Sequence, residues 1–154
     1  MIRLHTFGGI RVVDHRGDIV DGILAHRRPL ALLAIVAVNG QHGVTRDKLL
    51  GLLWPEADDE RARHSLTQAL YAARRALNVD DLFLIEGSIR LNRERIWVDV
   101  TAFGGALESQ NPEAALAMYS GPFLDGFRLS GAPEFDRWVT KQRAVLEDRA
   151  VSTL

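Results

Sequence analysis

The chain has 154 residues, of which 47% are hydrophobic, and a formal net charge of −1 at pH 7. This length suits one ordinary domain or two small ones with a packed core. The absence of cysteine excludes disulfides, thiolate metal sites and cysteine nucleophiles, and it fits a cytoplasmic protein. The near-neutral total argues against a uniformly basic nucleic-acid binder but permits local segregation of charge.

The N-terminal region, residues 1–21, predicts short strands joined by glycine turns. Its first 13 residues alternate around Gly8-Gly9 as in a β-hairpin and lack the apolar core and cleavage site of a signal peptide. We therefore expect a protein that is not exported. The longest apolar run, residues 30–38, is much shorter than the roughly 20 residues that a bilayer requires, so we expect no membrane partner.

Two helices are predicted before residue 55. Residues 27–39 carry apolar side chains at helical spacing, and Pro29 suits the first turn. Thr45 can cap a second helix that begins near Arg46 and ends before Pro55. The buried face expected for this second helix consists of Leu49, Leu50, Leu53 and Trp54.

The segment 61–77 is the most informative part of the chain. An α-helix turns about 100° per residue, which predicts one narrow apolar stripe of Ala62, Leu66, Leu70, Ala73 and Leu77. The opposite face would carry Arg61, His64, Gln68, Tyr71 and Arg75, with Arg63, Thr67 and Arg74 on the near flank. No acidic residue occurs between Glu60 and Asp80.

Arginine, glutamine and histidine on one exposed face supply phosphate charge and hydrogen bonds to base edges, as a helix in a DNA major groove requires. A plain solvated face is the alternative. The acids that precede this helix favour its positive N-terminal end, so we interpret them as caps and not as catalytic groups. They are Glu56, Asp58, Asp59 and Glu60.

A β-hairpin is predicted after the basic helix. Residues 82–86 and 89–92 flank Gly87-Ser88, and a second turn is expected over residues 92–95. Three helices followed by a hairpin is the order of a winged helix-turn-helix, in which the second helix of the pair enters the major groove and the hairpin reaches the adjacent backbone or minor groove. Arg90, Arg93 and Arg95 are the candidate wing contacts. The alternative is that they are edge-strand arginines that limit aggregation.

A second, all-helical unit is predicted to start near Asp99. Phe103 and Leu107 form one helical face, and Asn111-Pro112 is typical of a helix start, with that helix extending through Tyr119. Pro133 opens a longer helix whose apolar side carries Phe135, Trp138, Val139 and Leu146. These helices are typical of the opening of a helical-repeat array, and we expect them to be the N-terminal part of a longer domain.

Three segments in order, RRPLALLAIVAVNG, GVTRDKLLGLLWPE and RARHSLTQALYAARRAL, resemble the DNA-binding half of the SARP-type (antibiotic-regulatory-protein-like) bacterial activators, which share the OmpR-type winged-helix fold. The stretches VDVTAFGGAL, AALAMYSGPFLDGF and PEFDRWVTKQRAVLEDRA resemble the start of the bacterial transcriptional activator domain, a TPR-like helical domain. The resemblance implies an α+β fold: a winged helix over residues 1–98, with an N-terminal antiparallel sheet, three helices and a hairpin wing, followed by a TPR-like segment over 99–154.

The function predicted is a cytoplasmic, sequence-specific transcription activator that binds double-stranded DNA as a pair of protomers on a repeat. The resemblance implies that segment 61–77 is the recognition helix, that 82–92 is the wing, and that RNA polymerase is a partner. Residues expected at base edges are His64, Thr67, Gln68 and Tyr71, and those expected at phosphates are Arg63, Arg74, Arg75 and Arg90. The alternative is a protein-interaction module, which an exposed apolar stripe would favour; only Tyr71 interrupts the polar face.

An enzyme is not expected. The sequence contains neither a Gly-x-x-x-x-Gly-Lys phosphate loop nor a Gly-x-Ser-x-Gly elbow. The histidines at positions 5, 15, 26, 42 and 64 lack metal-ligand spacing. We therefore predict no catalytic residue, no metal and no cofactor.

Overall fold

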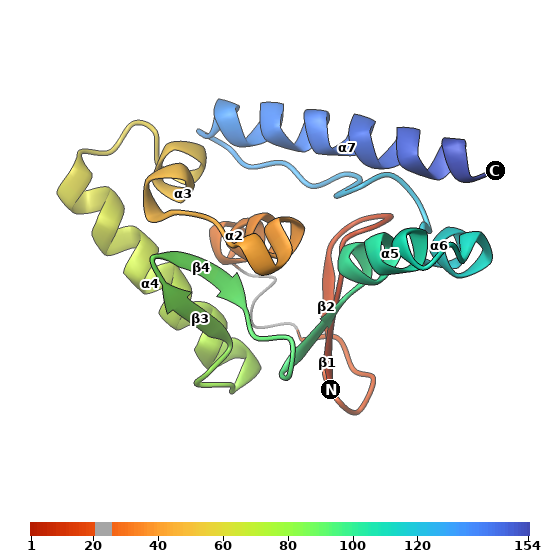
Figure 1. The fold of residues 1–154 in the computed structure, drawn as a ribbon. Coiled ribbons are helices and arrows are strands. Elements are labelled where there is room, and N and C mark those ends of the chain that lie inside the picture. Colours follow the sequence, from red (N-terminus) through yellow and green to blue (C-terminus); the bar gives the residue numbers. More distant parts are fainter. Residues whose placement is uncertain (21–25) are drawn as a thin grey trace.

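The computed structural model describes residues 1–20 and 26–154, which form a mixed α+β fold around helix α2 (Arg27–Asn39). Figure 1 shows α4 and the β3–β4 hairpin on one side of α2 and helices α5 and α6 on the other, with α7 running along the molecule. Residues 21–25, which belong to the predicted unit 1–98, lie outside the described residues. The prediction of strands and turns over residues 1–21 can therefore be compared with the structure only for residues 1–20.

The first sheet is mixed, with the strand order β2-β1-β5. Strand β1 (Ile2–His5) pairs antiparallel with β2 (Arg11–Val13), which confirms the predicted N-terminal hairpin. Strand β5 (Ile96–Val98) pairs parallel with β1, so the predicted antiparallel arrangement holds for β1 and β2 and the complete sheet is mixed. Strand β5 has only three residues, and its partner β1 lies far away in the sequence. So short a segment carries no pattern of its own that predicts a strand, and a parallel pair is joined by a long crossover instead of a tight turn.

The three predicted helices are present. After α2, a 3₁₀ turn (η1, Gly40–His42) leads to α3 (Arg46–Leu53) and then to α4 (Asp59–Leu77). Thr45 caps α3 as predicted, because its Oγ1 accepts a hydrogen bond from the Lys48 N–H at 3.2 Å. Leu49 and Leu53 are buried, but Leu50 and Trp54 are only half-buried, so the buried face of α3 is narrower than expected.

The hairpin after α4 consists of β3 (Phe83–Glu86) and β4 (Ser88–Leu91). Glu86 pairs directly with Ser88, so the turn is Gly87 alone and the predicted Gly87-Ser88 turn was one residue too long. Gly87 has φ 77°, a conformation that glycine adopts without the steric cost of a side chain. The predicted turn over 92–95 is present, since the Arg95 N–H donates to the Asn92 carbonyl oxygen at 2.9 Å.

Three helices complete the fold: α5 (Asp99–Glu108), α6 (Pro112–Met118) and α7 (Pro133–Thr153). Asn111 caps α6, and Phe135, Trp138, Val139 and Leu146 of α7 are all buried, as predicted. The buried Asp99 carboxylate accepts hydrogen bonds from the Thr6 N–H, the Thr6 hydroxyl and the Phe7 N–H at 2.7 to 3.0 Å. One continuous core includes residues from both sides of position 98; the division there remains a prediction.

Arginine side chains attach the segment before α7 to the first helices. The Arg28 guanidinium donates to the Leu53 carbonyl oxygen through Nε and to the Ser130 carbonyl oxygen through Nη2, both at 3.1 Å. The Arg27 Nε donates to the carbonyl oxygen of Arg128 at 2.9 Å. Helix α7 also packs against α3. Helix α3 therefore packs against the C-terminal helix as well as against α2.

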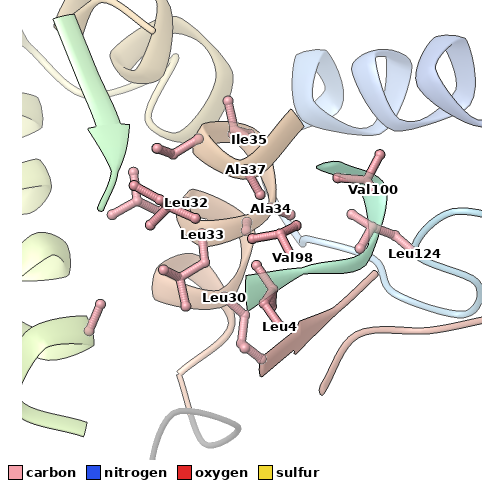
Figure 2. Close-up of a cluster of buried hydrophobic side chains, with 14 of the residues drawn as sticks. Leu4, Leu30, Leu32, Leu33, Ala34, Ile35, Ala37, Val98, Val100 and Leu124 are labelled. Carbon is pink, nitrogen blue, oxygen red and sulfur yellow. The ribbon is translucent and has the colours of Figure 1, made fainter. Parts of the chain in front are cut away.

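Helix α2 is the centre of the core. Nine consecutive residues, from Pro29 to Ala37, are buried. Figure 2 shows side chains of α2 packed together with residues that come from β1, β5, α5 and the segment before α7, namely Leu4, Val98, Val100 and Leu124. Among the described residues, no helix combines the length and apolar character needed to cross a bilayer.

Candidate nucleic-acid interface

Helix α4 is 19 residues long and has capping hydrogen bonds at both ends. Asp58 caps its start: the Asp58 Oδ1 accepts a hydrogen bond from the Arg61 N–H at 2.9 Å. Asp59 and Glu60 lie in the first turn, where carboxylates stabilise the positive end of a helix. The last turn closes at Asn78, whose left-handed backbone (φ 55°) directs its N–H to the Arg74 and Arg75 carbonyl oxygens. The interpretation of these acids as helix-start residues fits this geometry.

The buried side of α4 is the predicted stripe. Ala62, Leu66, Leu70, Ala73 and Leu77 are all buried, and Ala69 joins them. This stripe packs against α2 and α3. Because one face of the helix is held by the core, the opposite face is fixed in direction and open to solvent.

The exposed side of α4 carries the polar residues expected there. These exposed residues are Arg61, Arg63, His64, Thr67, Gln68, Tyr71 and Arg75. The Tyr71 side chain is 59% exposed, and the Arg75 guanidinium lies 6.0 Å from its ring centroid. The Thr67 hydroxyl donates to the Arg63 carbonyl oxygen at 3.1 Å, which leaves its Oγ1 available as an acceptor. We call this exposed set the α4 face.

Arg74 and Arg90 are placed differently from the other predicted contact residues, because both are half-buried. The Arg74 guanidinium lies over the Phe83 ring of β3, 5.6 Å from its centroid. Among the described residues, the Nε atoms of Arg74 and Arg90 are buried and find no hydrogen-bond acceptor. A buried donor without an acceptor is costly, and an atom that is shielded from solvent cannot reach a phosphate oxygen unless its side chain moves.

The β3–β4 hairpin is joined to the helix pair at Val44. Val44 and Ile89 exchange backbone hydrogen bonds of 2.9 and 2.8 Å. The Ser88 hydroxyl also donates to the His42 carbonyl oxygen at 3.2 Å. These contacts fix the position of Arg90, which lies in β4 next to Ile89, relative to the loop before α3.

The remaining two predicted hairpin contacts do not join the α4 face. The Arg95 Nε donates to both carboxylate oxygens of Asp81 at 3.0 Å, so its charge is already paired. Arg93 is exposed and borders a hollow formed by α2, β5, α5 and α7, which no residue of α4 lines. The structure therefore places Arg90 near the helix pair and directs Arg93 and Arg95 to other surroundings.

Two cations absent from the predicted set are exposed in the first turn of α3. Arg46 and Lys48 follow the Thr45 cap, with the exposed Asp47 between them. In a helix-turn-helix the first helix of the pair crosses the DNA backbone, so these side chains are additional candidates for phosphate contact. Because Thr45 was predicted to cap this helix, the sequence already indicated that both cations would lie in its first turn. Within the described part of the chain, no three His, Asp or Glu side chains gather as metal ligands would.

No protein-family model and no curated protein matches the sequence. Its arrangement of sheet, helices and hairpin is nevertheless an α+β fold seen in a solved structure. That structure is Mycobacterium tuberculosis EmbR in complex with a low-affinity phosphopeptide: the TM-score is 0.69 at 20% sequence identity, over 99% of this chain and 43% of the EmbR chain. At this identity the likeness establishes a similar fold, and this chain spans less than half the length of EmbR.

Proposed function

We propose that the protein is a sequence-specific DNA-binding transcription regulator of the SARP type, which inserts α4 into the major groove and uses the β3–β4 hairpin as a wing. The observation that carries the proposal is the α4 face: a solvent-exposed surface of arginine, histidine, glutamine and tyrosine with no acid between Glu60 and Asp80. The major groove of B-DNA admits an α-helix, and the buried stripe of α4 packs against α2 and α3, so the α4 face points to solvent.

The expected DNA contacts divide into two roles. His64, Thr67, Gln68 and Tyr71 would meet base edges, where the Gln68 amide can form a bidentate pair with adenine. Phosphate contacts would come from Arg63, Arg74, Arg75 and Arg90. Arg74 and Arg90 are half-buried, so less of each side chain is open to a phosphate than in the exposed Arg63 and Arg75. Phosphate contacts set affinity and register, and base contacts set the preferred sequence.

The experiment is a selection of bound duplexes from a random pool, repeated across a series of salt concentrations. We expect an enriched motif and an affinity that falls in log salt with a slope of about −0.9 per neutralised phosphate. Retained affinity without enrichment would remove the sequence-specific part of the proposal. Failure to bind at low salt would favour the protein-interaction module instead.

Two substitutions separate the roles. Gln68→Ala should relax the preference at one base position, because it removes a base contact, whereas Arg75→Gln should weaken binding to all sequences and reduce the salt slope by about 1. Arg16→Gln is the matched control for loss of a charge, since Arg16 is exposed in the turn before residue 20, distant in sequence from α4. Equal affinities of all three variants for the selected duplex would show that the α4 face does not contact DNA.

Activation, pairing on repeated sites and the TPR-like character of residues 99–154 are further parts of the proposal, which rest on the resemblance to SARP-type activators. A duplex with two copies of the selected motif should bind two protomers with higher affinity than two separate sites. Transcription in vitro with a bacterial RNA polymerase should rise when that duplex lies upstream of the promoter. An unchanged or reduced transcript level would limit the proposal to DNA binding or repression.

The protein-interaction alternative lacks a comparable observation on α4. Such a surface needs a contiguous apolar patch, and Tyr71 is the only large hydrophobic side chain that is exposed among the residues of α4, all of which are described. A tyrosine between polar neighbours is also suited to phosphate or thymine-methyl contact. The α4 face therefore favours DNA over an apolar partner.

A further inference from the structure

A hollow of about 730 Å³ lies on the side of α2 away from the α4 face. It is bordered by the end of α2, the edge strand β5, one face of α5 and the second half of α7, whose arrangement can be followed in Figure 1. Its size is within the range of about 300 to 1,000 Å³ found for small-molecule sites. Most of its wall is apolar; Val38, Ile96 and Val145 are representative.

The face of α5 that borders the hollow contains two adjacent glycines. Gly104 and Gly105 lie inside the helix, where each costs about 1 kcal/mol relative to alanine. A Cβ atom at either position would meet no atom within 4 Å, so packing within the described structure does not require glycine there. Both residues line the hollow. The two glycines therefore leave space in the hollow that larger side chains would occupy, and they do so at a cost in helix stability.

The side chains that line the hollow carry more positive than negative charge. Arg93 and Arg149 line it, and Glu108 is the only carboxylate among its lining residues. Within the described part of the chain neither arginine forms an ion pair. The Arg149 guanidinium lies 5.7 Å from the Phe103 ring centroid, which holds it beside the apolar wall. Val145, one helical turn earlier, is 46% exposed although it is an apolar residue.

We propose that this hollow is a binding site for an amphipathic organic anion, a molecule with an apolar body and one carboxylate, sulfonate or phosphate group. The apolar body would cover the exposed wall around Val145, which is the favourable term in such binding. The anionic group would form charge-assisted hydrogen bonds with Arg149 or with Arg93, which both line the hollow. The inference does not depend on DNA binding, because no residue of α4 lines the hollow.

The test uses anilinonaphthalene sulfonate, an aromatic sulfonate whose fluorescence rises in apolar surroundings. We expect saturable binding to the folded chain, at a 1:1 ratio. Decanoate should displace the dye, and decyltrimethylammonium, which has the same chain length and the opposite charge, should not displace it at the same concentration. Because this dye also binds partly folded states, the near-ultraviolet circular dichroism of the three tryptophans must stay native throughout.

Two substitutions locate the site. Arg149→Gln should weaken dye binding about tenfold, and Gly104→Leu should also weaken it by placing a side chain in the hollow, while it raises helix propensity and so keeps the fold intact. Arg16→Gln and Ala117→Leu are the matched controls, since both positions are exposed and neither lines the hollow. Both controls should bind the dye like the original chain.

Several outcomes would overturn the proposal. These are the absence of dye binding by the folded chain, displacement by both amphiphiles alike, and unchanged binding in both Arg149→Gln and Gly104→Leu. Sedimentation of the chain at increasing concentration gives one more: self-association that Gly104→Leu removes would show that a second copy, and not an organic anion, occupies the hollow.

Discussion

Helices α2 and α4 pack against each other but differ in how many of their side chains are buried. Helix α2 buries nine consecutive residues and has no free face over that stretch. Helix α4 buries one stripe of small and medium apolar residues and exposes the rest of its surface. The first pattern is that of a core helix surrounded on all sides, and the second is that of a helix with one face in solvent.

The difference separates stability from recognition. Substitutions in α2 change packed volume and should act on the folding equilibrium, whereas substitutions on the α4 face should leave folding almost unchanged and act on binding.

The largest expected effect is at the centre of α2. Leu33 is completely buried, so Leu33→Ala removes buried methyl groups and leaves a cavity, at an expected cost of about 3 kcal/mol in the free energy of unfolding. Gln68→Ala on the α4 face should change that free energy by less than about 0.5 kcal/mol. Urea denaturation of both variants measures the two effects. Similar costs would show that the two helices do not differ in this way.

The second effect is at the joint between the hairpin and the loop before α3. Gly43 has φ 72°, and a Cβ there would lie 2.6 Å from the Ser88 Oγ and 2.9 Å from the Ile89 carbonyl oxygen. Gly43→Ala should therefore cost about 2 kcal/mol and loosen the hairpin. Hydrogen exchange of the Ile89 amide, which donates to Val44, should accelerate.

Gly40→Ala is the matched control for the joint. Gly40 also has a positive φ, of 54°, but a Cβ there meets no atom within 4 Å. It should therefore destabilise the protein less and leave the exchange of the Ile89 amide closer to that of the original chain. If Gly40→Ala and Gly43→Ala had the same effect on that amide, the close contact with Ser88 and Ile89 would not be what holds the hairpin.

A smaller effect is expected at the start of α4. Asp58→Ala removes the side chain that caps the Arg61 N–H and should cost about 1 kcal/mol. Asp59→Ala removes a neighbouring carboxylate that makes no capping bond and should cost less than about 0.5 kcal/mol. Thermal unfolding compares the two. Equal shifts would mean that charge near the helix end, and not the capping hydrogen bond, is what stabilises α4.

The elements that could be predicted from the sequence are those encoded by local pattern. The stripe of α4, the caps Thr45 and Asn111 and the helix that starts at Pro133 were confirmed, because helical periodicity and capping act over a few residues. The exposure of the α4 face followed from the same periodicity. Its role in DNA binding remains a prediction.

The features that were missed depend on contacts between distant segments. Strand β5 becomes a strand through its pairing with β1, and no pattern within Ile96–Val98 shows this. The position of Arg74 over Phe83 and the ion pair of Arg95 with Asp81 also require the folded chain. The arginines were predicted to be equivalent, but the folded chain pairs or partly buries the charge of some of them. The sequence alone does not show this difference.

The smallest expected effect tests the sheet that supports α2. Burial and the positive charges of Arg11 and Arg3 lower the pKa of the His5 imidazole, and the Asp99 carboxylate acts in the opposite direction. The folded state thus favours the neutral ring, whose contribution to stability is complete above the ordinary pKa of 6.5 and is lost as the pH falls through the lower folded value. The unfolding free energy should therefore decrease on acidification from about pH 7.5 to about pH 5.5 more in the original chain than in His5→Gln, because glutamine takes up no proton in this range. Equal decreases would assign the pH dependence to groups other than His5, and the apolar scaffold around α2 would then be insensitive to the charge on the outer face of its sheet.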